Sequence, residues 1–231
     1  MAGGMILMGV LVALISVPSA MITHGVIMMT ANGWRAYLLS DYIHWSVFGR
    51  YLIGAAGGIL LLFAIAWRPD KPAIYFILAS LPVIVWIPKS WFHLDIRAPG
   101  QAIGAGFIIQ AMNTLGGVAG PLLDIFFVNT DMTRQAIVAT KSATQAISHS
   151  IKICFWAGPL FWGMQMQTEP GFSADLPPVW FLGLAAALAM MGTWCGKQIL
   201  VRMSDANFQK WVRGLITLIG LVYLARAMGW V

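Results

Sequence analysis

Residues 140–152 read TKSATQAISHSIK, a run of polar side chains within a largely apolar stretch from about residue 136 to residue 163. That stretch exceeds the roughly 20 helical residues that cross the hydrocarbon layer of a bilayer. Polar and ionisable side chains at bilayer depth are costly, so they usually mark a functional site. This segment therefore predicts a membrane helix that carries part of a site.

The rest of the chain has the composition of a membrane protein. Hydrophobic residues make up 59% and charged residues 10% of the 231 residues, against about 25% charged residues in soluble domains. We therefore predict an all-α polytopic bundle of about seven or eight spans, forming one integral membrane domain over residues 1–231. The candidate helices lie at about 5–22, 23–40, 50–67, 73–88, 102–128, 136–163, 178–196 and 212–229.

Two of these segments carry proline or glycine interruptions. The first has only a short apolar run before Pro18, which predicts a half-span packed against protein. Its small residues at 17–20 resemble a signal-peptide cleavage site, but residues 1–4 lack the positive charge of such a peptide, so we interpret it as a retained segment. The fifth is interrupted at 113–121 by the sequence NTLGGVAGP, which predicts a helix break whose backbone groups face protein or a wet cavity.

The net charge of +6 comes mainly from short loops, where Lys and Arg orient membrane helices, so we expect the lipid bilayer and no nucleic acid as a partner. The basic loops 68–71 and 197–213 are predicted to be cytoplasmic, and the loops 89–101 and 164–177 external. The two cysteines and four histidines lack metal-ligand spacing, and hydrolase motifs are absent, so we expect no metal, no other cofactor and no enzymatic activity.

An offset of 117 residues aligns a weaker copy of the polar pattern with the first one. It pairs Thr23-His24-Gly25 with Thr140-Lys141-Ser142, Asn32 with His149, and Arg35 with Lys152. We predict two related four-helix repeats, at about 1–100 and 101–231. Because the basic loops of both repeats are predicted to lie on the same side of the membrane, we expect an axis along the membrane normal to relate the two halves, as in parallel repeats.

Within each copy, the polar residues step by three or four positions and so share one helix face. No carboxylate accompanies Arg35 or Lys152 on these stripes, which favours an anion as the transported ligand. Backbone N–H groups at the Gly-rich break could also hold an anion. The candidate substrate-binding residues are Asn32, Arg35, Asn113, Gly117, Gly120, Thr140, Ser142, Gln145, His149 and Lys152.

Several neighbouring groups have two interpretations. His149 could gate protonation or serve as an interhelical hydrogen-bonding group. Lys141 could add a cation to the site or extend to the interface. Asp124 could pair with a cation or carry a coupling proton, and His24 is expected near the cytoplasmic mouth.

The segments GGVAGPLL at 116–123 and ATKSATQ at 139–145, with His149 and Lys152, resemble the second repeat of the sulfite exporter TauE/SafE family of membrane permeases. The resemblance implies a carrier for small anions such as sulfite or sulfoacetate, working by alternating access in a bacterial plasma (inner) membrane. The first repeat departs from the family pattern, because its Gly-rich turn is reduced to Gly3-Gly4. The alternative is therefore a non-transporting subunit with the same fold. The sequence leaves open whether the protein forms a homo-oligomer or joins a membrane complex.

Overall fold

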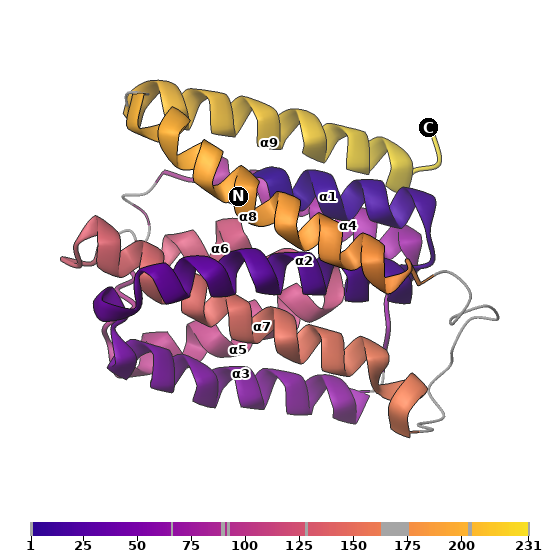
Figure 1. The fold of residues 1–231 in the computed structure, drawn as a ribbon, viewed down its shortest axis with the longest axis horizontal. Helices are drawn as coiled ribbons and strands as arrows, with labels where there is room; N and C mark the ends of the chain where they lie inside the picture. Colours follow the sequence, from indigo (N-terminus) through magenta and orange to yellow (C-terminus); the bar gives the residue numbers. More distant parts are fainter. Residues whose placement is uncertain are drawn as a thin grey trace.

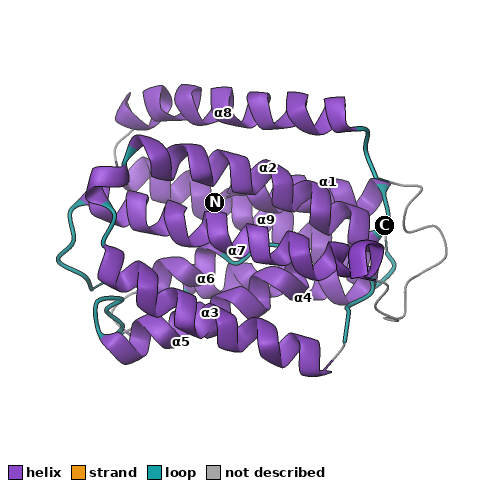
Figure 2. Cartoon of the chain, turned by 60° about the horizontal axis from the view of Figure 1, so that its bottom comes forward, coloured by secondary structure: helices purple, strands orange, loops and turns teal. Residues whose placement is uncertain are grey.

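The computed structural model describes residues 2–65, 67–88, 91, 93–127, 129–162, 176–202 and 205–230, and these contain helices and no strands. This confirms the predicted all-α class. The helices form one bundle of roughly aligned rods (Figure 1, Figure 2). Their bounds are α1 Ala2–Leu14, α2 Val17–Leu38, a 3-10 turn η1 Ser40–Tyr42, α3 Trp45–Ile65, α4 Lys71–Trp86, α5 Pro99–Gly116, α6 Gly120–Ile125, α7 Arg134–Trp162, α8 Val179–Arg202 and α9 Asp205–Ala227.

Hydropathy differs among the helices. Of the described helices, α3 alone combines the length and apolarity of a membrane span, with a mean hydropathy of 1.8, while shorter apolar stretches occur in α1, α4 and α8. The polar stripes lower the mean hydropathy of α2 and α7, because their polar residues lie in the helix middle. The 13 residues of α1 rise about 20 Å, less than a full bilayer core, as the sequence predicted.

The predicted break in the fifth segment is confirmed. Helix α5 ends at Gly117, which has a φ of 78° in the left-handed region. After Val118 and Ala119, α6 begins at Gly120 and runs for 6 residues. The chain then returns to the start of α5, where the amide of Ile96 donates to the carbonyl of Phe126 (2.8 Å). Helices α5 and α6 therefore enter and leave at the same end of the bundle.

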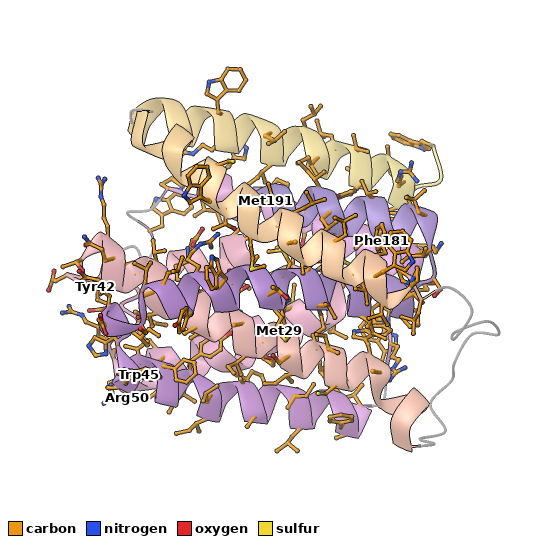
Figure 3. The ribbon with its side chains drawn as sticks, in the orientation of Figure 1. Met29, Tyr42, Trp45, Arg50, Phe181 and Met191 are labelled. Carbon is orange, nitrogen blue, oxygen red and sulfur yellow. The ribbon has the colours of Figure 1, made fainter. Side chains whose placement is uncertain are left out.

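Apolar side chains fill two cores and also cover the outside. One core joins α1, α2, α4 and α9 with the end of α7, and the second joins α3, α5 and α6. Large apolar side chains such as Ile53, Leu60 and Phe76 are more than 60% exposed, as lipid-facing side chains are. Aromatic residues gather at helix ends: Tyr42 and Trp45 lie with Arg50 where α2 leads into α3 (Figure 3).

The helix directions contradict a parallel repeat. Helices α2 and α7, which the 117-residue offset makes equivalent, run antiparallel, so that His24 contacts Lys152. Helices α4 and α9 are also antiparallel, with Trp86 donating to the Thr217 hydroxyl. The α3–α4 connection lies at one end of the bundle and the α8–α9 connection at the other (Figure 1). The prediction that loops 68–71 and 197–213 share one side was therefore wrong.

Arg68 explains the error at the first of these loops. Its guanidinium donates to the carbonyl of Phe155 (2.8 Å) and lies 5.1 Å from the ring centres of Phe155 and Trp156. A cation held in this way is fixed by the protein and does not report the side of the membrane. The loop before α5, predicted external, lies instead at the end where α8 meets α9 (Figure 1).

Helices α3 and α5 pack through glycine. A Cβ at Gly106 would collide with the backbone carbonyl of Tyr51, and a Cβ at Gly54 with that of Ile103. Neither backbone atom can move without shifting its helix. Close backbone approach at small residues is the usual means of helix association in membranes, and here it fixes the helix that leads to the break.

We expect Gly106→Ala to destabilise the protein by at least about 1–3 kcal/mol, the usual cost of overpacking. Thermal unfolding in detergent would measure the change. Gly104→Ala on the same helix is the matched control, because a Cβ there meets nothing within 4 Å. Equal melting temperatures for the two variants would contradict this packing.

An ionic contact outside the helices closes the loop before α5. Arg97 donates to Asp95 (2.8 Å) and Asp131 (2.9 Å), and its hydrogen bonds hold the pKa of Asp95 below the usual value. A carboxyl with a lowered folded-state pKa adds stability above its unfolded pKa, about 3.9, and loses it as the pH falls through the folded pKa. We expect Asp95→Asn to lower the melting temperature near pH 7, with a difference from wild type that begins to shrink below about pH 4 and vanishes once the pH is below the lowered folded-state pKa. A constant difference would contradict this assignment.

Candidate functional site

A cavity of about 210 Å³, lined by polar and apolar side chains, lies between α1, α2, α6 and α7. Both polar stripes contribute to it, because antiparallel α2 and α7 turn them toward one another. No acidic side chain is among its lining residues. These are Gly4, His24, Met28, Ala31, Asn32, Arg35, Val118, Ala119, Gly120, Leu123, Val138, Lys141, Ser142, Gln145 and His149.

The mouth of the cavity is formed by cations. Arg35 lies in the last turn of α2, and Lys141 lies in the early part of α7. Lys141 forms an ion pair with Asp124 of α6, and the two side chains are 23% and 25% exposed. Among the residues that the structure describes, Arg35 has one long hydrogen bond, to the Asn32 side chain (3.5 Å). Its guanidinium therefore keeps most of its donors for a ligand.

The deep end of the cavity is formed by two histidines with a lysine beneath them. His24, His149 and Lys152 are 1%, 2% and 0% exposed. The two imidazole rings meet edge to face with centres 5.5 Å apart. Lys152 does not line the cavity, because its Nζ lies behind His24, 2.9 Å from Nδ1 of that ring.

The contacts of His24 define its hydrogen-bonding roles. Its Nε2 lies 3.0 Å from the carbonyl oxygen of Gly4, which can only accept, so Nε2 carries the proton. Its Nδ1 faces Nζ of Lys152, which donates when charged. When Lys152 is charged, His24 must therefore be neutral, because its Nδ1 accepts the hydrogen bond from Nζ.

The helix break supplies the second partner of Lys152. The Gly117 carbonyl accepts a hydrogen bond from Nζ (3.1 Å). A Cβ at Gly117 would meet the Met8 sulfur at 2.6 Å, and the positive φ of Gly117 is strained for other residues. Glycine is thus required where α1, α5 and α7 meet beneath the cavity.

Buried hydrogen bonds fix α7 against α5. Trp156 donates to the Thr114 carbonyl (2.8 Å), and Gln110 donates to the Ser148 carbonyl (3.4 Å). Asn113 lies behind His149, with its amide 3.5 Å from Nδ1 of the ring. This network orients the ring and leaves Nε2 of His149 for the cavity.

One family model matches the chain. It is the model of Sulfite exporter TauE/SafE, and it covers residues 1–223. The chain belongs to the TauE/SafE family. Its members are integral membrane transporters, so this protein has a lipid environment and a small-molecule substrate, and the family resemblance drawn from the sequence is confirmed. No curated protein and no solved structure matches the chain significantly.

Six of the ten residues predicted to bind substrate line the cavity of this TauE/SafE protein: Asn32, Arg35, Gly120, Ser142, Gln145 and His149. The other four lie outside the lining. Asn113, Gly117 and Lys152 support the floor from behind. Thr140 faces the other way and accepts a hydrogen bond from the backbone amide of His44 (3.0 Å).

The structure also places groups that the sequence left uncertain. His24 lies at the floor, not at the mouth, because α2 begins at Val17 with Pro18 in its first turn, two turns before His24. Lys141 lines the cavity instead of extending to the interface, and Asp124 is its partner. The 117-residue offset pairs His24 with Lys141, and this was the signal that both belong to the site.

Among the described residues, no group of three or more His, Cys, Asp or Glu side chains could hold a metal ion. The described part of the cavity instead combines guanidinium, ammonium, imidazole, amide and hydroxyl donors. Such a donor set suits an anion with several oxygen acceptors.

Proposed function

We propose that this TauE/SafE protein is a permease that moves a small anion, with sulfite, sulfoacetate or a similar sulfur-containing anion as its substrate. The observation that carries the proposal is the cavity, whose lining includes Arg35, Lys141 and two histidines but no acid. Charged groups inside a membrane protein are retained where they serve a substrate or ion path. A cavity of this size lined by cationic side chains also favours a carrier over a non-transporting subunit, which would pack its centre tightly.

The size of the cavity agrees with a small substrate. At about 210 Å³ it is below the roughly 300 Å³ at which pockets for drug-sized ligands begin. Gln145 adds a side-chain Nε2 that is buried without a hydrogen-bond partner in the described structure. An unpaired buried donor is costly, and a sulfonate or sulfite oxygen in the cavity would satisfy it.

We propose alternating access between two inverted halves. The 117-residue offset makes Lys141 the equivalent of His24, and Arg35 the equivalent of Lys152. The contact between His24 and Lys152 therefore has the pair of Lys141 and Arg35 as its counterpart. Lys141 and Arg35 line the opposite, open end of the same cavity. A twofold axis in the membrane plane, the arrangement of inverted repeats, relates two pairs placed in this way. The repeats remain about 1–100 and 101–231.

The cavity faces the cytoplasm in this proposal. The residues at its mouth, Arg35 and Lys141, belong to the last turn of α2 and the early part of α7. These helix ends lie at the end of the bundle where α8 meets α9 (Figure 1), and the sequence there contains Lys197, Arg202, Lys210 and Arg213. Basic residues near short loops mark the cytoplasmic side. We place the protein in a bacterial inner membrane, on the basis of its family.

Cysteine labelling tests whether the cavity is wet and binds anions. We expect Ser142→Cys, in a background without Cys154 and Cys195, to react with the anionic reagent sulfonatoethyl methanethiosulfonate. A cleft of one charge sign raises the local concentration of its counter-ion about tenfold or more. Saturating sulfoacetate should slow the reaction, because it occupies the same space.

Ser148→Cys is the matched control on the same helix. Ser148 is fully buried and faces the hydroxyl of Tyr51 (2.7 Å) instead of the cavity. Labelling of both cysteines at equal rates, or no effect of sulfoacetate, sulfite analogues or small carboxylates on Ser142→Cys, would overturn the proposed function.

A further inference from the structure

Lys152 has the hydrogen-bond partners of a neutral amine. In the described structure Nζ has two acceptors, Nδ1 of His24 (2.9 Å) and the Gly117 carbonyl (3.1 Å), and no carboxylate partner. A neutral amine has two N–H groups, so these acceptors satisfy it. An ammonium has three, and its third N–H would lack a partner in this fully buried position.

The hydrogen bonds of His24 limit how many protons it can hold together with Lys152. Its Nε2–H is committed to the Gly4 carbonyl, and its Nδ1 accepts from Lys152. A second proton on Nδ1 would point at Nζ, so the two groups hold at most one added proton between them. The pair is therefore a one-proton site joined to the cavity through the ring of His24.

The charges around this site are cationic on the cavity side. His149 of α7 faces His24 with its ring centre 5.5 Å away, and Arg35 and Lys141 stand at the mouth. Asp124 of α6 pairs with Lys141. In the described structure, α1 and α5 bring the Gly4 carbonyl, the Gly117 carbonyl and the Asn113 amide, and the side chains of α8 over residues 179–195 carry no charge.

A charge buried without a counter-charge is costly, and an anion beside it removes much of that cost. We propose that the Lys152–His24 pair is a proton site coupled to the anion site, so that each bound anion brings one proton. The proton comes from hydronium or a protonated buffer molecule in the aqueous solution that enters the cavity, and it adds to the free electron pair of the amine. It leaves to water when the anion leaves on the other side.

This inference rests on the proposed function and adds the coupling ion. Binding linkage is reciprocal, so the proton strengthens anion binding as the anion strengthens proton binding. Proton and anion then cross together. An acid exterior should therefore drive accumulation of the anion inside proteoliposomes.

Calorimetry in two buffers tests the coupling. Sulfoacetate is the ligand used, because both of its acid groups stay ionised near neutral pH. Titration of the wild-type protein in phosphate and in Tris, whose heats of ionisation differ, gives the number of protons taken up. We expect about one proton per sulfoacetate, the same number with Lys71→Met, and close to none with Lys152→Met. Lys71 is an exposed residue of the same type, at the start of α4.

His149→Gln locates the proton if Lys152→Met fails to fold or bind. Uptake of one proton by His149→Gln supports the Lys152–His24 pair, and loss of the uptake would move the site to His149 and overturn the assignment. Binding of sulfoacetate by wild type with equal heats in both buffers would overturn the coupling while leaving the proposed function intact. Absence of binding by sulfoacetate, sulfite and small carboxylates alike would overturn the proposed function and the coupling with it.

Discussion

Lys152→Ala is expected to reduce anion flux in proteoliposomes by at least about 30-fold while the protein still folds. The side chain is fully buried and joins His24 of α2 to the Gly117 carbonyl at the helix break. Its loss removes the amine beneath the floor, which in our proposal is positively charged while an anion is bound, and leaves two acceptors unpaired. A hydrogen bond to a charged group contributes about 1.5–3 kcal/mol, and each 1.4 kcal/mol corresponds to about a tenfold change in rate.

Lys71→Ala is the matched control, because Lys71 is exposed at the start of α4. It should carry flux at the wild-type rate. Size-exclusion chromatography and thermal unfolding would establish that Lys152→Ala is folded. Wild-type flux through folded Lys152→Ala would contradict a role for the floor in transport.

Arg35→Gln is expected to raise the KM for a divalent anion such as sulfoacetate about fivefold to tenfold, with a smaller change in kcat. Arg35 stands at the mouth, and the one side-chain bond that it makes within the described part of the chain, to Asn32, is long (3.5 Å). Its loss therefore costs little stability. Two unit charges 4 Å apart at a protein surface interact by about 4 kcal/mol before screening, and partial exposure reduces this to about 1 kcal/mol.

Ionic strength separates this electrostatic role from a structural one. The wild-type KM should rise with salt, and the difference between wild type and Arg35→Gln should shrink. Arg97→Gln is the control, because Arg97 is a guanidinium outside the cavity that contacts Asp95 and Asp131. A KM unchanged in Arg35→Gln, or a difference independent of salt, would remove Arg35 from the anion path.

Helix positions and the break could be predicted from the sequence because their signals are local. Long apolar runs bounded by Pro, Gly or charged residues located the helices, and NTLGGVAGP at 113–121 located the end of α5. The three- and four-residue steps correctly brought Asn32, Arg35, Ser142, Gln145 and His149 to one cavity.

The relative direction of the two halves could not be predicted, because an offset in sequence aligns residues without fixing the axis that relates them. The loop charges suggested a parallel pair, and Arg68 misled because it is held over Phe155 and Trp156. The antiparallel arrangement changes the site. It brings Lys152 to His24 and leaves Arg35 with Lys141 at the mouth.

The contacts of side chains that depend on packing between distant helices also could not be predicted from the sequence. Thr140 shares the polar stretch but bonds the backbone of His44, because the chain after η1 passes the start of α7. Asp124 meets Lys141 because α6 returns toward the end where α7 begins. No local pattern encodes either contact.

Uptake of labelled sulfite and sulfoacetate by proteoliposomes of the wild-type protein tests whether this protein is an anion permease. We expect saturable uptake above that of protein-free liposomes, with each anion inhibiting uptake of the other. Uptake no faster than in protein-free liposomes, for both of these anions and for thiosulfate and small carboxylates, would contradict an anion permease.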